Sequence, residues 1–412
     1  MPEPAAWKYQ KITKPMFDTP APPPRLFLGR VLPCTDAGVT EDGFVLVEGG
    51  KIAAVGPRDD MPPAPADCET IDTGGKTIMP GMMNSHAHLS WDGIHELSQQ
   101  SMFDAPEIRA YKAAGNMLKS LRAGITLVRD LGVHDANLFT KQAVAQGIFP
   151  GPRLLVSGAA IIQTGGHTYW VCREASGADE MRRAVREQVK GGADLIKIMA
   201  CHDTLEFTDA ELEAVIDEAH RNRLPITAHA TYDACIARVA EAGIDCVEHG
   251  GSMTDATIQT LLDRKIPIVT TFSALVIQAN AEIARAFGIP EWKIAERQRA
   301  VADKTRFDGL VRAARAGVPI VFGTDAGSPA VEHDQIVPEL EFMVEVGVCP
   351  DTMDALRAIT RRAAVLNGFG DRLGTLEPGK LADLIVVDGK PDQDLGALRR
   401  VEMTFIDGRR MH

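Results

Sequence analysis

The stretch from about residue 80 to residue 366 alternates short apolar segments with amphipathic helical patterns, and this alternation constrains the fold most strongly. One intervening helix is expected to begin at a capping box formed by residues 208–211, in which Thr208 and Glu211 satisfy free backbone N–H groups. Strand–helix units repeated eight times over ~250 residues predict an α/β fold, a (β/α)8 TIM barrel. A doubly wound sheet is the alternative, and it would gather its polar residues at one switch point. The segments expected to be strands are 81–89, 125–131, 153–160, 194–200, 225–230, 246–250, 267–273 and 319–325.

Both ends of the chain differ from the middle, because they contain short strand patterns separated by glycine turns. Segments 25–79 and 367–412 are similar in type although they lie far apart in the sequence. We therefore expect them to pair into one small β-sandwich beside a catalytic barrel formed by residues 80–366. Residues 1–24 contain four prolines between positions 20 and 24, which predicts a disordered N-terminal arm.

The composition argues against several functional classes. The chain has 56 acidic and 44 basic residues, a net charge of −12, whereas a nucleic-acid binder needs a basic face. No apolar run reaches the ~18 residues of a membrane span, and residues 1–30 lack the apolar core of a secretory signal. The seven cysteines are scattered without a CxxC pair, which is typical of reduced thiols in a cytoplasmic protein.

Polar side chains occupy the ends of several predicted strands. His86 and His88 are two residues apart, so on a strand they project to the same face and can share one metal ion. Taken alone, such a pair is equally consistent with a surface feature. However, His229 and His249 close two successive strands, and Asp325 closes the eighth. The carboxyl ends of barrel strands form the catalytic face, so the sequence predicts a metal site there.

Lys197, on the fourth predicted strand, is also counted among the residues at the carboxyl ends of the strands. It lies inside the apolar segment 195–199, where a charged side chain is costly unless it is paired or neutralised. One interpretation is a lysine whose side chain extends from the strand end to water. The other is a lysine modified by carbon dioxide, since burial lowers the amine pKa and makes the group nucleophilic. The resulting carbamate carries two anionic oxygens that can bridge two cations.

With these residues in place, the chain resembles the amidohydrolase superfamily along nearly its whole length. Residues 80–88 resemble the motif that begins the barrel of this superfamily, and residues 376–384 resemble its return into the β-sandwich. Segments 164–167, 197–200 and 323–328 resemble a binuclear group related to imidazolonepropionase. That group contains Xaa-Pro dipeptidases, other dipeptide carboxypeptidases and ochratoxin-hydrolysing amidases.

The resemblance implies two divalent metal ions. Zinc is the default identity, but the same ligands also suit Co, Mn or Fe, and metal availability often decides which ion is bound. The resemblance also implies a homo-oligomer, a bridging hydroxide, and carbon dioxide held as N6-carboxylysine. The ligands implied are His86, His88 and Asp325 for the more buried ion, His229 and His249 for the second, and carboxylated Lys197 as the bridge.

The same resemblance implies catalytic roles. Asp325 would pass the proton of the hydroxide to the leaving amine. His167 would donate a hydrogen bond to the substrate carbonyl, although a structural loop histidine is the alternative. The sequence departs from the group at residues 168–170, 201–203 and 231–232, where substrate would lie. Further candidates for substrate contact, for each of which a structural role is at least as well supported, are Tyr169, Tyr232, His202 and His333.

These expectations define a metal-dependent amidohydrolase that cleaves an amide or peptide C–N bond of a small molecule, either an N-acyl amino acid or a dipeptide. A cyclic amide or imidazolone-type ring hydrolase, or a metal-dependent decarboxylase on the same scaffold, is the alternative. The chain contains no GxGxxG, P-loop or GxSxG motif, which argues against nucleotide binding and serine hydrolysis. The segment beginning at His95 fails the HExxH pattern at its last position.

Overall fold

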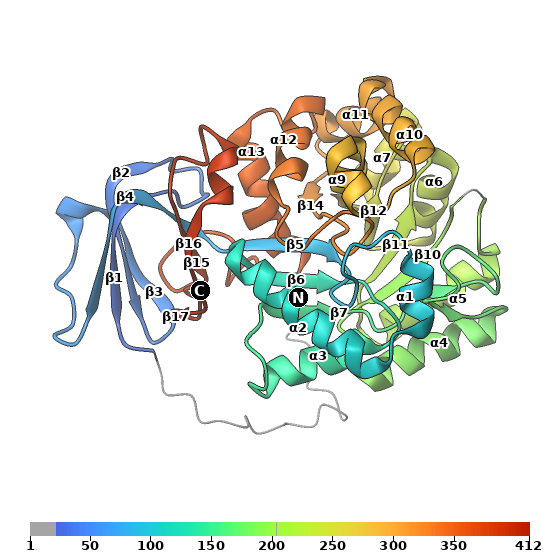
Figure 1. Ribbon diagram of the computed structural model, residues 1–412, viewed down its shortest axis with the longest axis horizontal. Coiled ribbons are helices and arrows are strands. Elements are labelled where there is room, and N and C mark those ends of the chain that lie inside the picture. The colour runs from blue at the N-terminus through green and yellow to red at the C-terminus, as the bar shows by residue number, and fades with distance from the viewer. Residues whose placement is uncertain (1–21, 203) are drawn as a thin grey trace.

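The computed structural model describes residues 22–202 and 204–412, and Figure 1 shows a helix-rich parallel part beside a separate sheet. Residues 1–21 of the predicted N-terminal arm lie outside the described residues. Among the described residues, no helix combines the length and the apolar character needed to cross a membrane.

The parallel part contains two sheets that follow the chain order. One sheet joins β5 (Met82–Ala87), β6 (Ile125–Asp130) and β7 (Arg153–Val156). The other has the order β14-β13-β12-β11-β10-β8-β9. Its strands are β8 (Ile161–Ile162), β9 (Arg173–Glu174), β10 (Ile196–Met199), β11 (Ile226–Ala230), β12 (Cys246–His249), β13 (Ile268–Thr270) and β14 (Ile320–Phe322).

Backbone hydrogen bonds connect the two parallel sheets at both junctions. The Asp194 amide, before β10, donates to the Val156 carbonyl of β7 over 2.8 Å. Beyond β14, the Asp325 amide donates to the His86 carbonyl over 2.9 Å, and the His88 amide donates to the Ala326 carbonyl over 2.8 Å. The fold is therefore TIM-barrel-like, as the repeated strand–helix pattern predicts. A doubly wound sheet would instead require a reversal of strand order.

Helices cover the outside of these strands (Figure 1). Helix α5 begins at the predicted capping box, where the Thr208 hydroxyl accepts from the Glu211 amide and the Glu211 carboxylate accepts from the Thr208 amide. The covering helices are α2 (Pro106–Arg122), α3 (Ala136–Ala145), α4 (Ala178–Gly191), α5 (Asp209–Arg221), α6 (Asp233–Ala242), α7 (Asp255–Asp263), α11 (Asp308–Ala316) and α12 (Val337–Val346).

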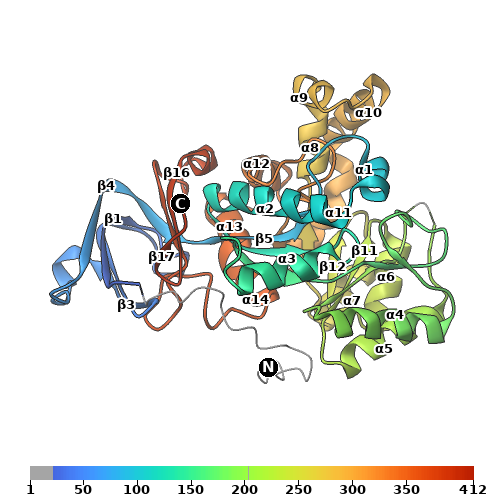
Figure 2. The same cartoon turned by 60° about the horizontal axis from the view of Figure 1, so that its bottom comes forward.

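Further helices complete the parallel part, and Figure 2 shows α9 and α10 standing out from it. These α-helices are α1 (Leu97–Phe103), α8 (Ser273–Ala279), α9 (Ala281–Ala286), α10 (Glu291–Ala302), α13 (Thr352–Arg357) and α14 (Ala363–Leu366). The remaining helical segments are η1 (Arg58–Asp60), η2 (Lys304–Phe307), the π-helical η3 (Ala358–Arg362) and η4 (Leu395–Arg399).

The third predicted strand, 153–160, is not continuous. β7 ends at Val156, and β8 begins only at Ile161. Between them Gly158 has a φ of +68°, a left-handed conformation that turns the chain and favours glycine. A Cβ at Gly158 would lie 2.2 Å from Oε1 of Gln188, an atom that accepts a hydrogen bond from the Ala159 amide. This turn explains why β7 stops four residues before the predicted limit at residue 160, and why β8 begins only beyond it.

The two chain ends form one seven-stranded sheet of order β17-β16-β15-β4-β1-β2-β3. β4 connects the ends, because it pairs with β1 in parallel and with β15 in antiparallel orientation. Its strands are β1 (Arg25–Val31), β2 (Thr40–Glu48), β3 (Lys51–Pro57), β4 (Glu69–Pro80), β15 (Leu384–Val387), β16 (Val401–Ile406) and β17 (Arg409–Arg410).

The pairing of the two ends agrees with the expectation, but the predicted sandwich of two sheets is a single curved sheet. Phe27 of β1 meets Phe405 of β16 edge to face with ring centroids 4.9 Å apart, although two strands separate β1 from β16 in the sheet order. The sheet therefore curls around its own core. β4 allows the sheet to curl because its 12 residues pair with β1 from one chain end and with β15 from the other. Its register with β1 is irregular between Leu28 and Arg30. The domain limits at residues 79–80 and 366–367 stay predictions.

Candidate active site

The predicted metal ligands lie on strands from both parallel sheets, on the side where the strands end. His86 belongs to β5, His229 to β11 and His249 to the last position of β12. Asp325 lies three residues beyond β14, which ends at Phe322. Lys197 differs from the expectation, since it is the second residue of β10 rather than its end, and is therefore set deeper in the strand.

One group of possible ligands consists of His86, His88 and Asp325, whose ligand atoms all lie within 4.8 Å of one another. Asp325 Oδ1 is 3.3 Å from His86 Nε2 and 3.0 Å from His88 Nε2. Burial alone would raise the pKa of the Asp325 carboxyl, but the hydrogen bonds to the two imidazoles hold it well below its usual range. A carboxylate between two imidazoles is a donor set that divalent metals accept.

A buried ion pair supports this group from below. Glu248 Oε2 accepts a hydrogen bond from His86 Nδ1 over 2.8 Å, and Glu248 Oε1 accepts from Arg129 Nη2 over 2.5 Å. The Thr227 hydroxyl donates to the same Oε1. Burial would raise the pKa of Glu248, but the charge of Arg129 and the hydrogen bond from His86 hold it far below its usual value. The carboxylate thus orients the His86 ring.

Two of the other imidazoles, those of His88 and His249, are also oriented through Nδ1. His88 Nδ1 donates to the Gly132 carbonyl over 2.6 Å, and His249 Nδ1 lies 2.7 Å from the Thr271 hydroxyl. When Nδ1 is engaged by a second partner, Nε2 is the nitrogen left to bind a metal ion.

His229 and His249 form the second histidine pair, with ring centroids 4.3 Å apart. The pKa values of both rings lie well below the usual histidine value, chiefly because of burial and also because the positive charge of Lys197 opposes their protonation. The Nε2 atom of His229 is buried and has no hydrogen-bond partner in the described part of the chain. Neutral imidazole is the form that coordinates metal ions.

Lys197 is 2% exposed, and its Nζ also lacks a hydrogen-bond partner among the described residues. Burial lowers the pKa of this amine, and the charge of Arg129 lowers it further, against the attraction of Glu248 and Asp325. A buried, unpaired ammonium is costly, so the environment favours a neutral and nucleophilic amine.

Two of the possible ligands have strained backbones. His249 and Asp325 have φ angles of 69° and 60°, in the left-handed region that side-chain-bearing residues rarely adopt. Such conformations cost about 1–3 kcal/mol each and occur preferentially at functional sites, where surrounding structure maintains them.

His167 lies on the segment after β8, and its ring centroid is 5.5 Å from that of His229. The His167 amide donates to Glu206 Oε1 over 2.9 Å, and the ring stacks on His202 at a centroid distance of 3.8 Å. His167, His202 and His229 form a second group whose ligand atoms lie within 4.8 Å of one another. The structure thus brings two predicted substrate-contacting histidines, His167 and His202, next to His229, one of the possible metal ligands.

The other candidate residues lie in different surroundings. Tyr169 is 53% exposed, whereas Tyr232 is half-buried and burial raises its pKa to about 12. His333 is buried and donates from Nε2 to the Trp91 carbonyl over 3.2 Å, while burial lowers its pKa to about 4. The centroid of the Trp91 ring is 4.8 Å from that of His88 and 6.0 Å from that of Trp170. His333 therefore supports the Trp91 main chain, and its contact with substrate stays a prediction.

Sequence reasoning missed Arg129, Glu248 and Glu206. Arg129 and Glu248 each place a charged side chain next to apolar residues in a short strand segment, as Lys197 does, and the sequence therefore offered a signal for them. Glu206 offered no such signal, because it lies on an irregular segment between β10 and α5.

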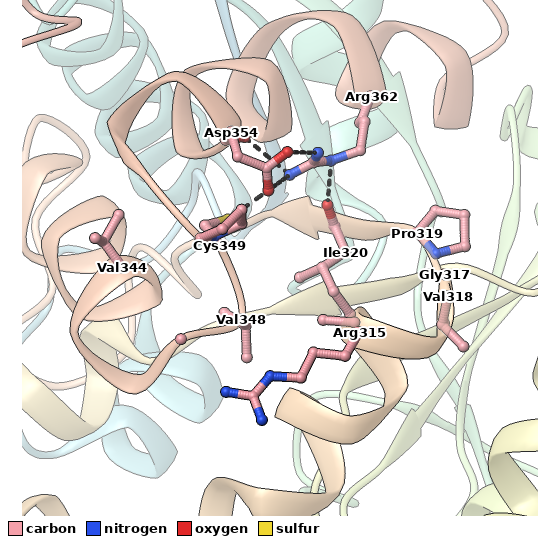
Figure 3. Close-up of a pocket in the computed structure, with 13 residues that line it drawn as sticks. Arg315, Gly317, Val318, Pro319, Ile320, Val344, Val348, Cys349, Asp354 and Arg362 are labelled. Atoms are coloured by element: carbon pink, nitrogen blue, oxygen red, sulfur yellow. Dashed lines mark hydrogen bonds and ion pairs between the residues drawn. The ribbon is translucent and has the colours of Figure 1, made fainter.

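A separate cavity of about 610 Å³ lies at the opposite end of β14, next to Pro319 and Ile320 (Figure 3). Its charged walls include Asp354 and Arg362, which pair with each other over 2.7 Å. None of the predicted site residues lines this cavity. It is therefore distinct from the cluster of possible metal ligands.

Comparison with known proteins defines the class. The chain belongs to the amidohydrolase family, whose profile matches residues 77–411. It is 27% identical to ochratoxinase of Aspergillus niger, with 90% of this chain and 82% of that protein aligned. It is 25% identical to imidazolonepropionase of Pseudomonas putida, over 84% and 87% of the two chains. Among solved structures, a Xaa-Pro dipeptidase with bound methionine matches with a TM-score of 0.83 and 26% identity, over 94% and 99% of the chains.

Proposed function

We propose that this protein is a metal-dependent hydrolase that cleaves an amide or peptide C–N bond in an N-acyl amino acid or a dipeptide. The observation that carries the proposal is the grouping of His86, His88 and Asp325 next to a second histidine pair, His229 and His249, whose pKa values the charge of a buried, unpartnered lysine lowers. The family membership and the similarity to ochratoxinase and to a Xaa-Pro dipeptidase support the same reaction type.

The residues present suit two divalent cations. Their donor set is rich in imidazole and contains one strongly acidic carboxylate, and this chemistry suits zinc and similar ions. The buried Nε2 of His229 and Nζ of Lys197 are polar atoms that lack protein partners in the described chain, as metal-directed groups would. His86, His88 and Asp325 would hold one ion, and His229 and His249 would hold the other.

Lys197 would bridge the two ions as N6-carboxylysine. The bond forms between Nζ of the neutral amine and the carbon of carbon dioxide, and the amine loses one proton. The low pKa of Lys197 supplies the neutral amine that this reaction needs. The anionic product would then no longer be an unpaired group in a buried site.

Two cations held in this way supply hydroxide at neutral pH and polarise a carbonyl group. Asp325, whose ionised carboxylate borders His86 and His88, accepts the proton of the attacking hydroxide and transfers it to the departing nitrogen. His167 donates a hydrogen bond to the carbonyl oxygen as negative charge develops on it.

The substrate would be a small amide with an apolar or aromatic group. Tyr169, Trp170 and Tyr232 flank the segments that carry His167 and His229, in a chain with only 5% aromatic residues. Aromatic walls favour flat or apolar ligand groups. Nothing in the charge pattern favours a nucleic-acid or membrane partner, and a homo-oligomeric state is proposed by analogy with relatives.

A ring hydrolase remains the second candidate, because the similarity to imidazolonepropionase extends over most of the chain. A decarboxylase on the same scaffold would release carbon dioxide and no amine. The two reactions and amide hydrolysis therefore differ in their products.

The test is a screen of N-acyl amino acids, dipeptides and cyclic amides with metal-reconstituted protein, followed by product analysis. We expect equal amounts of a free carboxylate and a free amine. Turnover only on cyclic substrates would reject the amidase proposal in favour of the ring hydrolase. Release of carbon dioxide without an amine would establish the decarboxylase.

A further inference from the structure

The segment between β10 and α5 makes two contacts with His167 that the catalytic roles above do not require. Glu206 Oε1 accepts a hydrogen bond from the His167 main-chain amide over 2.9 Å. His202, four residues earlier, stacks on the His167 ring at 3.8 Å with only 7° between the ring planes. One segment therefore holds His167 both by its backbone and by its imidazole.

Glu206 is built into the structure rather than lying on its surface. It is 5% exposed, and its second oxygen, Oε2, is buried without a hydrogen-bond partner in the described chain. A Cβ at Gly166 would lie 1.9 Å from this Oε2, so the carboxylate occupies the space that a side chain there would need. Glu206 and the Gly166–His167 backbone thus interlock closely.

The Glu206 segment is itself held in place. The Glu206 amide donates a hydrogen bond to the Ala200 carbonyl over 3.1 Å, and Cys201 pairs with Leu205 in an isolated antiparallel bridge. Ala200 directly follows β10, the strand that carries Lys197. Glu206 therefore links the His167 backbone to β10, the strand that carries Lys197.

We propose that Glu206 is a positioning residue for catalysis, which holds His167 so that its imidazole can meet the substrate carbonyl. The inference rests on the role proposed for His167. A misplacement of a catalytic group by about 1 Å can cost 10²-fold in rate, so a contact that fixes the His167 backbone has kinetic consequences. Loss of the Glu206 contact should lower kcat more than it changes KM, because the hydrogen bond that His167 donates acts mainly on the transition state.

The kinetic test compares Glu206→Ala and Glu206→Gln, using the N-acyl amino acid or dipeptide that the screen shows to be turned over fastest. Glu206→Ala should lower kcat at least tenfold with KM within about twofold. Glu206→Gln keeps an oxygen acceptor for the His167 amide and should retain most of the activity. In a His167→Ala background, Glu206→Ala should cause no further loss of kcat. An equal loss in both backgrounds would overturn the proposal, since Glu206 would then act on something other than His167.

Hydrogen exchange at the His167 amide, measured on the metal-loaded protein, provides a readout independent of turnover. Glu206→Ala should accelerate exchange in the peptide that contains His167. Glu339→Ala is the control, because Glu339 is also buried and accepts a backbone amide, that of Ser273, but does not contact His167. Unchanged exchange in Glu206→Ala would overturn the inference alone. Accelerated exchange together with full activity of His167→Ala would overturn the role proposed for His167, and the catalytic positioning role with it.

Discussion

Glu248 Oε2 lies 2.8 Å from His86 Nδ1, and both side chains are almost completely buried. The other carboxylate oxygen accepts from Arg129, so a salt bridge between β12 and β6 lies directly beneath a possible metal ligand on β5. The orientation of His86 therefore depends on an ion pair between residues far apart in the sequence.

Replacing Glu248 should lower both the unfolding free energy and the metal affinity, and the two losses have different causes. Glu248→Leu leaves Arg129 buried without its partner, which should cost about 3–5 kcal/mol of unfolding free energy in urea titrations. The double variant Arg129→Met with Glu248→Leu should recover most of that stability, because no uncompensated charge remains. Metal affinity should stay reduced at least tenfold in both, since His86 has lost its orienting carboxylate. Normal metal affinity in the double variant would contradict this role for Glu248.

Lys197→Ala should lose the metal pair and most of the activity. Wild-type protein should approach two metal ions per chain in elemental analysis, whereas the variant should bind them poorly because no carbamate bridges the site. A short carboxylic acid such as propionate should partly restore activity by occupying the vacated space. Lys141→Ala is a matched control, since Lys141 pairs with Asp194 on the outer side and should neither lose metal nor respond to propionate. Full activity of Lys197→Ala would reject the bridge.

Asp325→Asn should be nearly inactive even where metal remains bound. The amide retains the size of the carboxylate and one oxygen for the imidazoles of His86 and His88, but it cannot accept a proton. We expect a fall in kcat of at least 10²-fold, of the size typical for lost acid–base catalysis. Metal content and kcat should be measured on the same preparation. The control is Asp354→Asn, which should keep normal kcat because Asp354 lines the separate cavity next to Pro319 and Ile320. Substantial turnover by metal-loaded Asp325→Asn would assign the proton transfer to another group.

The positions of the ligand candidates were predictable because each is a local signal. A histidine or aspartate that closes an apolar strand, as His229 or Asp325 does, can be recognised without knowledge of the fold. Their grouping followed from a fold-level rule, that the ends of barrel strands meet at one face. The depth of Lys197 was not predictable, because an apolar pattern does not fix where a strand ends, and β10 continues for two residues beyond Lys197.

Features that depend on contacts between distant segments could not be predicted. The Arg129–Glu248 pair joins residues on β6 and β12, which five other strands separate in chain order, and neither sequence neighbourhood specifies the partner. The continuity of the end sheet through β4 likewise depends on which edges meet. Glu206 illustrates the same limit, because its proposed role depends on the hydrogen bond that it accepts from the His167 amide, 39 residues away in the sequence.

Glu339 should make stability depend on pH. Burial raises the pKa of this carboxyl from 4.5 to about 7, although it accepts hydrogen bonds from the amide and hydroxyl of Ser273. Its protonated form is favoured in the folded state, so its contribution is complete below the unfolded pKa and is lost as pH rises through about 7. The loss should reach about 3 kcal/mol at most.

Urea unfolding at about pH 5 and about pH 8 provides the measurement, and the comparison with Glu339→Gln isolates this group from the others that titrate. Glutamine imitates the protonated acid, so the variant should lose less stability across this interval than the wild type. Identical pH dependence in the two proteins would show that Glu339 is ionised in the folded state at neutral pH.

His167→Ala should lower kcat and kcat/KM together by about 10²–10³-fold, because one hydrogen-bond donor to a developing oxyanion is typically worth that factor. Metal content should be unchanged, since the two ligand groups proposed for the ions do not include His167. His220→Ala is the control, because His220 pairs with Asp245 over 2.8 Å at a partly exposed position away from the ligand cluster. Steady-state kinetics on the best amide substrate separates the possibilities. A rise in KM with unchanged kcat would mean that His167 binds the substrate in its ground state and does not stabilise the transition state.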